Sequence, residues 1–415
     1  MLFVLYVISS MADGDSLKHW GGSFSVMPGR AVVIDKWQKK WQKGTKNWAI
    51  DIKVTRATLL SDSDGFARDY GFPTLSVGLR WSFNHGVIVH KGVEFWGEQE
   101  NVLKEVDYDS HMGNILSFYG QFARPFLRTP QWEVDYTIDM GVAWSPSAYN
   151  KIDNIDNELI GSRMLIFFGA GLHAMYHFSH PWGVKMGVDF YHHSNGALDR
   201  PNKGANIVAP SLGLVYQPYY DGAMQKQHDV RNSFKKYWYV NLSTSIGART
   251  LMEEWQLTQF YTTPGEADYR TANFKHYLAF AASADVIYRY ACRWASGLGF
   301  DLFYGNYDKR LKEISLARGY DETVSPWSLG VAAKHETFYH NLSLNVSLGF
   351  YLYRKMGTWT KELEKPYYER IGLNYGFPKL NGLKIGINVK AHRFKADLTE
   401  LLVSYPIVFF TNKGQ

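Results

Sequence analysis

The stretch that decides the fold is residues 132–140, which read WEVDYTIDM. Every even-numbered residue in it is apolar and every odd-numbered residue is polar, three of the four being acidic. Successive side chains of a β-strand point to opposite faces, so a period of two predicts a strand with one apolar and one polar face. Residues 238–247, 342–352 and 383–390 alternate in the same way. We therefore predict an all-β protein.

A soluble β-sandwich also alternates, but three features favour an antiparallel transmembrane β-barrel of the outer-membrane type. The alternating segments run to about ten residues or more, longer than the usual strand of a soluble domain. Their polar faces carry Gly, Ser, Asn, Asp and Lys, as the lumen of a barrel does. Aromatic residues such as Trp132, Trp144 and Trp182 stand at segment ends, where interfacial girdles form.

The number of strands is predicted at about 14–16. An odd number cannot place both termini on the same side, so a further strand in 21–35 gives about 16, whereas omission of 48–60 gives about 14. The strands are predicted at 48–60, 73–84, 113–124, 131–144, 163–178, 182–194, 206–217, 236–249, 275–290, 294–305, 325–337, 341–353, 366–376, 382–393 and 398–410.

The links between these strands alternate between short and long, as expected for periplasmic turns and external loops. Two links break the rule. Residues 217–236 are long where a short turn is due, and the last link, near 393–396, is short. We nevertheless expect residues 13–415 to form a single barrel, because no linker or second domain is apparent.

Composition narrows the class of protein. The chain has 415 residues, of which 46% are hydrophobic and 16% aromatic, so it can bury enough surface to fold. No run of about 18 apolar residues predicts a transmembrane helix. The net charge of +6 comes with no long basic run and no nucleic-acid motif, so we expect no nucleic-acid partner. The single cysteine, Cys292, excludes an intrachain disulfide and a cysteine-based zinc site.

The N-terminus reads MLFVLYVISS, followed by Met11 and Ala12. An apolar run of this length before small residues is typical of a secretion signal, although the usual positive charge at its start is absent. We expect residues 1–12 to be such a signal, truncated at its start. The alternative is a buried N-terminal strand.

One segment combines the strand pattern with candidate catalytic side chains. The apolar, lipid-facing row of 182–194 continues through Phe190 into His192 and Ser194. Residues i and i+2 lie on the same face roughly 6.5–7 Å apart, so an imidazole could approach the hydroxyl and act as its general base. Asn206 enters the same face from the next strand and could orient the imidazole. Asn195 and Gly196 could supply an oxyanion hole. The alternative is that Ser-Asn-Gly is turn chemistry that opens a loop.

The run 190–206, FYHHSNGALDRPNKGAN, resembles the signature of outer-membrane lipid A 3-O-deacylases and related acyloxyacyl-hydrolase-like proteins. The shared pattern is His-x-Ser-Asn-Gly, a short spacer and Pro-Asn-x-Gly, and the resemblance extends over 113–219. It implies a serine esterase, a carboxylic ester hydrolase of the bacterial outer membrane, that removes an ester-linked acyl chain from lipid A, the anchor of lipopolysaccharide. By this resemblance His192 is the general base, Ser194 the nucleophile and Asn195 an oxyanion ligand. His193 points into the lumen by alternation.

The sequence departs from this family in two ways. The family carries a glutamate at about the place of Asn206, so this residue would orient the imidazole without an acid's charge. Asp199 and Glu158 are other candidate acids. The family's barrels also have about eight strands, which leaves the residues beyond about 230 without a counterpart.

We expect lipid A and outer-membrane lipid as partners, and no metal or other cofactor, because acyl transfer to water needs none. A competing hypothesis is a non-enzymatic barrel, a porin or ligand-binding channel that keeps the signature as a fold element. A lumen wide enough for water would favour the channel, and a packed lumen would favour the esterase. The acyl position cleaved and the oligomeric state are not determined by the sequence.

Overall fold

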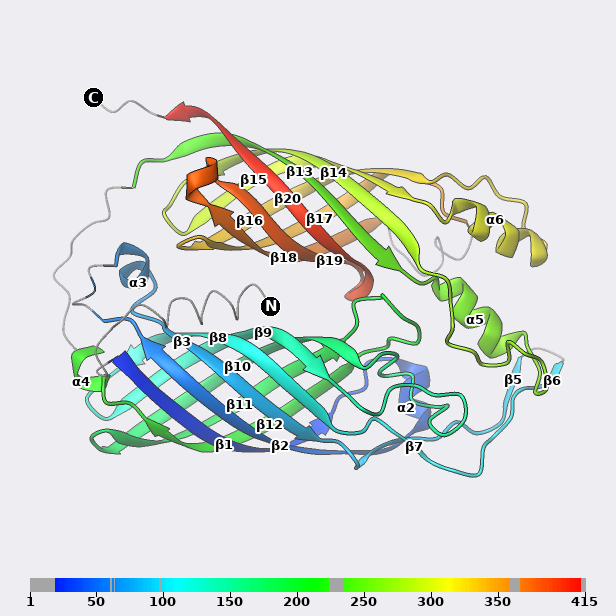
Figure 1. Cartoon of the computed structure of the whole chain (residues 1–415), viewed down its shortest axis with the longest axis horizontal. Helices are drawn as coiled ribbons and strands as arrows, with labels where there is room; N and C mark the ends of the chain where they lie inside the picture. The colour runs from blue at the N-terminus through cyan, green and yellow to red at the C-terminus, as the bar shows by residue number, and fades with distance from the viewer. Residues whose placement is uncertain are drawn as a thin grey trace.

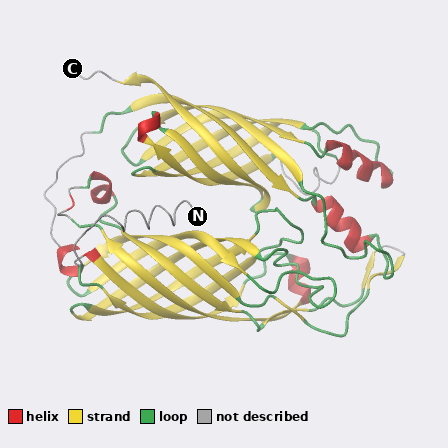
Figure 2. Cartoon of the chain, viewed as in Figure 1, coloured by secondary structure: helices red, strands yellow, loops and turns green. Residues whose placement is uncertain are grey.

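The computed structural model of the chain describes residues 19–59, 62, 64–96, 99–223, 234–357 and 366–411. The predicted signal at 1–12 lies outside these residues. Within them, the long strands form two closed antiparallel barrels that lie side by side (Figure 1). The predicted all-β, antiparallel barrel fold is therefore confirmed, and strands dominate the molecule (Figure 2).

The first barrel has eight strands in the order β1-β12-β11-β10-β9-β8-β3-β2, and β1 closes it by pairing with both β12 and β2. The eight strands are β1 (Trp20–Ala31), β2 (Gln42–Ala57), β3 (Thr74–Phe83), β8 (Ile115–Arg128), β9 (Trp132–Trp144), β10 (Met164–Ser179), β11 (Trp182–Ser194) and β12 (Ala205–Tyr216). The connections contain β4 (Val87–Val89), β5 (Glu94–Trp96), β6 (Gln99–Leu103), β7 (Ser110–His111), α2 (Lys36–Trp41), α3 (Gly65–Asp69) and α4 (Tyr220–Ala223).

The second barrel closes through β13 and β20, and its strands follow each other in chain order. They are β13 (Tyr237–Arg249), β14 (Tyr277–Arg289), β15 (Trp294–Gly305), β16 (Trp327–Tyr339), β17 (Leu342–Arg354), β18 (Tyr367–Phe377), β19 (Leu383–His392) and β20 (Lys395–Thr411). Its connections contain α5 (Met252–Phe260), α6 (Asp308–Ala317) and the short 3-10 helix η3 (Pro378–Leu380).

The expectation of a single barrel over 13–415 is wrong, because the strands close into two rings of eight. The long link at 217–236, which broke the alternation of short and long links, leads from β12 of the first barrel to β13 of the second. Period-two patterning sets which face of a strand is apolar, but it does not set which distant strand closes the ring.

Strand alternation sorts side chains into an outward apolar row and an inward polar row in both barrels. In β11, Met186 and Val188 are about half exposed, whereas Lys185 and Asp189 are buried. In β20, Leu401 is exposed and Glu400 is buried. Apolar rows that face out and charged rows that face in are the arrangement of a barrel surrounded by lipid. None of the helices in the described ranges has the length and apolar character needed to cross a membrane.

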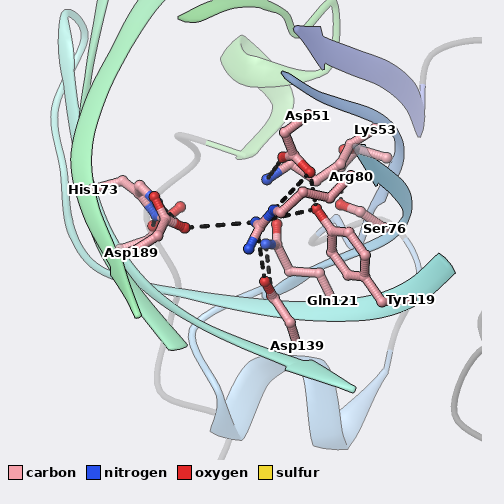
Figure 3. Close-up of polar contacts among 11 residues, drawn as sticks. Asp51, Lys53, Ser76, Arg80, Tyr119, Gln121, Asp139, His173 and Asp189 are labelled. Atoms are coloured by element: carbon pink, nitrogen blue, oxygen red, sulfur yellow. Dashed lines mark hydrogen bonds and ion pairs between the residues drawn. The ribbon is translucent and has the colours of Figure 1, made fainter. Parts of the chain in front are cut away.

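The lumen of the first barrel is packed around Arg80, whose side chain is fully buried (Figure 3). Its guanidinium lies 3.3 Å from Asp51, 3.5 Å from Asp139 and 3.8 Å from Asp189. His173 Nε2 lies 3.2 Å from Asp189, which extends the network along the lumen. The opposite charges neutralise each other in a site closed to water, so the polar faces of the strands form a solid core.

The second barrel has a similar charge network around Asp301, which is fully buried. Its carboxylate accepts hydrogen bonds from Tyr368 Oη at 2.6 Å and Lys334 Nζ at 2.7 Å, and Arg370 lies 3.4 Å away. Glu400 pairs with Arg370 at 2.5 Å. Both barrels therefore have cores of paired charges and aromatic rings.

The barrels contact each other at both ends. We call the end that carries α2, α5 and α6 the long-loop end, and the opposite end the short-turn end (Figure 1). At the short-turn end, Tyr70 Oη donates to Phe338 O at 2.9 Å and its ring packs against Tyr339. At the long-loop end, Arg270 of the second barrel is buried against Asp156 of the first at 2.7 Å.

Candidate active site

The predicted site lies at the long-loop end of β11. In the β10–β11 ladder, His192 lies opposite Phe168 and Ser194 opposite Ile166, so the strand keeps its regular alternation through both residues. His192 therefore continues the outward row of Met186 and Val188, as predicted. It is half-buried, whereas Ser194 is only 9% exposed.

Asn206 contacts His192 as predicted. The two residues are register partners in β11 and β12, and His192 Nδ1 lies 2.8 Å from Asn206 Oδ1. An amide oxygen only accepts hydrogen bonds, so Nδ1 carries the proton and Nε2 keeps its lone pair. This is the tautomer that a general base requires. Among the hydrogen bonds of the described residues, none joins His192 to Ser194.

Gly204 forms the wall against which the imidazole of His192 packs. A Cβ atom on Gly204 would lie 2.5 Å from Cε1 and 3.3 Å from Nε2 of His192, and Gly204 has φ +75°. Both the positive φ and the close approach require glycine. The second glycine of the sequence signature thus sets the position of the ring.

Asn195 organises the loop from 195 to 204. Its backbone N–H donates to Asn202 Oδ1 at 3.1 Å, its Nδ2 donates to Asp199 O at 3.1 Å, and its Oδ1 accepts from Ala197 N–H at 3.1 Å. The Asn195 backbone N–H is therefore already used within the loop. Among the hydrogen bonds of the described residues, none uses the Gly196 N–H, which is the next backbone donor along the chain.

The other segments of the signature region pack against this loop. A Cβ atom on Gly161 would collide with Pro201 O, so the loop before β10 lies directly on the loop after β11. Lys203 N–H and Gly204 N–H donate to Glu158 O and Leu159 O, each at 3.0 Å. Two segments about forty residues apart in the signature region thus form one folded unit around His192.

Asp199 and Glu158, the other candidate acids, are engaged elsewhere. His276 Nε2 lies 2.9 Å from Asp199 Oδ1. Glu158 pairs with Lys91 and with Lys203, the latter at 2.7 Å. Burial alone would raise the pKa of Glu158, but the two ammonium groups lower it below its usual range. Burial lowers the pKa of Lys91 to about 8. Of the three candidates, only Asn206 has a described hydrogen bond to His192.

His193 points into the lumen, as alternation predicted. It is fully buried, and its Nε2 lies 2.9 Å from Ser117 Oγ. It is enclosed by Phe167 and Tyr191, with ring centroids 5.3 Å and 5.8 Å away. This second Ser–His contact is sealed inside the barrel, where no lipid can reach it.

The depth of Ser194 on the barrel follows from the ladder. Ser194 lies opposite Ile166, and Met164, two residues before Ile166 at the start of β10, lies opposite Trp144. Trp144 is 47% exposed on the outward row and Trp81, on β3, is 51% exposed. Exposed tryptophans near the end of an apolar row mark the level of a membrane interface. Ser194 therefore lies just inside this aromatic level.

Three residues of the second barrel that sequence reasoning missed lie against the same loop. Thr399 Oγ1 donates to Gly196 O at 3.0 Å, and Thr250 N–H donates to Ala197 O at 3.3 Å. The third is His276, which pairs with Asp199. They are separated from the loop by up to 203 positions in the sequence, and no local pattern connects them to it.

Two closed antiparallel barrels with apolar outer rows define a β-barrel protein of the transmembrane type. The model of the lipid A 3-O-deacylase family matches residues 73–215, which run from β3 to the end of β12. The model of the acyloxyacyl hydrolase C-terminal domain matches residues 238–409, nearly the whole second barrel. Together the two models cover most of the chain, which therefore belongs to the lipid A 3-O-deacylase and acyloxyacyl hydrolase family, a family of ester hydrolases.

Among curated proteins, none matches the chain. Similar solved structures include the ferric enterobactin receptor of Pseudomonas aeruginosa (8% identity, 91% of this chain, TM-score 0.24). The chain spans 54% of that receptor's length. A porin of Rh. blastica (8% identity, TM-score 0.17) is covered to 99% by 94% of this chain. OccAB1 of Acinetobacter baumannii (10% identity, TM-score 0.25) is covered to 96% by 94% of this chain. Sequence identities and TM-scores this low carry no argument about function.

Proposed function

We propose that the protein is an outer-membrane serine esterase that hydrolyses an ester-linked acyl chain of lipid A. Ser194 is the nucleophile, His192 the general base and Asn206 the residue that orients it. The observation that carries the proposal is the 2.8 Å contact between His192 Nδ1 and Asn206 Oδ1 on the outward face, within the region that matches the deacylase family. It leaves Nε2 of His192 as the free base, two residues from a serine on the same strand face.

The reaction follows the usual course of acyl transfer. Ser194 Oγ attacks the ester carbonyl carbon while its proton passes to His192 Nε2. The negative charge on the carbonyl oxygen is stabilised by the Gly196 N–H and by the second amide hydrogen of Asn195. The sugar alkoxide leaves with the proton from His192. Water then hydrolyses the acyl-enzyme, again with His192 as base, and the fatty acid is released.

Asn206 favours the required tautomer but carries no charge, so it stabilises the imidazolium less than a carboxylate would. The direct Ser194–His192 hydrogen bond that the mechanism needs is one that often forms only when substrate is bound. Ser194 is 9% exposed, so substrate binding must also open access to its hydroxyl.

The position of the site suits an amphiphilic substrate. The acyl chains of lipid A lie beside the barrel wall, and their ester groups lie just below the headgroups. Ser194 lies at the end of an apolar row, two residues inside the level of Trp144. An ester in this position meets the serine without leaving the membrane. Localisation in the outer membrane is part of the same proposal.

The packed cores argue against a solute channel as the main function. A water-filled channel would expose inward-facing charges. Arg80 and Asp301, inside the two lumens, are both fully buried. The charges around Arg80 and Asp301 are paired with opposite charges inside the barrels, which leaves the outer surface for chemistry.

The proposal is tested by mass spectrometry of lipid A from cells that make the native chain or Ser194→Ala. We expect lipid A to lose one acyl chain with the native chain only, because without the hydroxyl the attack on the ester cannot occur. Barrel folding, checked by heat-modifiable migration on gels, should be the same for both. Identical lipid A from the two strains would contradict the proposal.

A further inference from the structure

The loop that carries the proposed oxyanion donors is held by the second barrel as well as by the first. Thr399 Oγ1 donates to the Gly196 carbonyl at 3.0 Å. Thr250 N–H donates to the Ala197 carbonyl at 3.3 Å. His276 pairs with Asp199 on the same loop at 2.9 Å. Residues from three separate parts of the second barrel thus meet one short loop of the first.

Thr399 is placed for this contact by its strand. It continues the outward row of β20 that contains Leu401 and Val403, which are 62% and 43% exposed. On most of this surface a threonine would face lipid. Here the hydroxyl instead meets Gly196 so closely that a Cβ atom on Gly196 would collide with it. The contact therefore depends on glycine at 196 and on a small polar residue at 399.

The backbone at this point is in an unfavourable conformation. Gly196 has φ +63°, and the next residue, Ala197, has φ +72°. A non-glycine residue in the left-handed region costs free energy and persists only when its surroundings hold it there. The carbonyl groups of both residues are held by the second barrel, Gly196 O by Thr399 and Ala197 O by Thr250.

Hydrogen bonds hold the peptide groups on both sides of the Gly196 Cα, one of which carries the Gly196 N–H. The peptide group that contains it also contains the Asn195 carbonyl, which accepts from Leu198 N–H at 3.2 Å. The following peptide group is held by Thr399 at its oxygen and by Asn195 Oδ1 at the Ala197 N–H. The peptide groups before and after the Gly196 Cα are therefore both held. Because the Gly196 N–H lies in the plane of the first of them, its direction is restrained as well.

We propose that Thr399 is a positioning residue for the esterase: its hydroxyl holds the Gly196–Ala197 peptide so that the Gly196 N–H points at the developing oxyanion. This inference rests on the proposed function. It makes the second barrel a part of the active site. A donor held in place before reaction contributes in the transition state, so its loss lowers kcat with little change in KM.

The test compares native protein, Thr399→Val, Thr399→Ser and Ser194→Ala as full chains, with lipid A in detergent micelles as the substrate. Valine has nearly the shape of threonine, so the fold is expected to persist, and Thr399→Ala is a second variant without the hydroxyl. A matched control is Thr244→Val. Thr244 lies exposed on the outward row of β13, and among the described residues its hydroxyl donates to Ala281 O, within the second barrel.

We expect Thr399→Val and Thr399→Ala to lower kcat roughly tenfold or more with KM within about twofold, since a small displacement of a catalytic group has effects of this order. Thr399→Ser and Thr244→Val should keep most of the native kcat. Native kcat in Thr399→Val, an equal loss in Thr399→Ser, or a change confined to KM would overturn the inference while leaving the proposed function intact. A native chain no more active than Ser194→Ala would overturn both.

Discussion

The two barrels each carry a serine and a histidine on their outward surface, and the surroundings of the two pairs differ. In the second barrel, Ser296 Oγ lies 2.9 Å from His335 Nδ1, and Thr337 Oγ1 lies 3.4 Å from Nε2 of the same ring. In the first barrel, His192 is hydrogen-bonded to Asn206, and within the described part of the chain it makes no hydrogen bond to Ser194. Judged by hydrogen bonding alone, the second barrel has the better pair.

The difference lies in what surrounds each serine. Ser296 is inside a ladder, opposite Tyr288 on one side and His335 on the other, so its backbone neighbourhood is taken up by strand pairing. Ser194 is the last residue of β11 and leads into a loop with positive φ at Gly196 and Ala197. That loop can present backbone N–H groups to an oxyanion, and a regular strand cannot. Esterase chemistry requires the loop as much as the pair.

The largest expected effect separates these two pairs. His192→Asn should lower deacylation at least about a thousandfold, because the nucleophile loses its base. Ser296→Ala and His335→Asn should leave activity within about twofold. The measurement is release of fatty acid from lipid A by purified protein, followed by mass spectrometry. Loss of activity in the Ser296 or His335 variants would reverse the assignment.

His193 provides the matched control for His192, because it is the next residue but faces the lumen. His193→Asn should keep most of the activity per folded molecule. The buried contact to Ser117 is weakened by the change, so stability should fall by about 1–3 kcal/mol. Equal inactivation of the His192 and His193 variants, at equal folded fractions, would contradict the outward-facing site.

A smaller effect is expected at Asn206. Asn206→Asp places a carboxylate beside the imidazole, and a charged acceptor stabilises the imidazolium of the transition state better than an amide does. We expect kcat to rise several-fold in Asn206→Asp and to fall roughly tenfold in Asn206→Ala. Single-turnover rates of acyl release would measure both. If both variants shift kcat in the same direction, Asn206 does not act through the histidine.

The smallest effect concerns the contact between barrels at the short-turn end. Asp64 Oδ2 lies 2.8 Å from His340 Nε2, and Asp64 Oδ1 caps α3. Burial alone would raise the pKa of Asp64, but the hydrogen bond and charge of His340 lower it. A lowered carboxyl pKa contributes stability above its usual range, and this stability is lost as pH falls through the folded-state value.

Asp64→Asn keeps the cap and removes the charge. The expected loss in unfolding free energy is therefore less than about 1 kcal/mol at pH 6, since the pair is partly exposed, and it should be smaller at pH 3. Denaturant unfolding at the two pH values measures it. If the difference in unfolding free energy between the native protein and Asp64→Asn grew on acidification, the coupling between Asp64 and His340 would have the opposite sign.

Local patterning predicted the strands closely. The predicted strand at 182–194 coincides with β11, and the further strand proposed in 21–35 is β1 (Trp20–Ala31). The same alternation placed His192 outward and His193 inward, because the direction of a side chain on a strand depends only on its parity. The pairing of β1 with β12 and of β13 with β20 could not be predicted in this way, since it joins segments far apart in the chain.

What the amino-acid order determined by itself is therefore the strand faces, the apolar belt and the His-x-Ser-Asn-Gly loop, all of which arise from interactions between near neighbours. Only the tertiary structure decided that the ring closes twice, and that Thr399 meets Gly196 across 203 positions. Closure depends on which edge strands find each other and on the loop entropy of bringing them together. These are properties of the whole chain, and no short stretch of the sequence determines them.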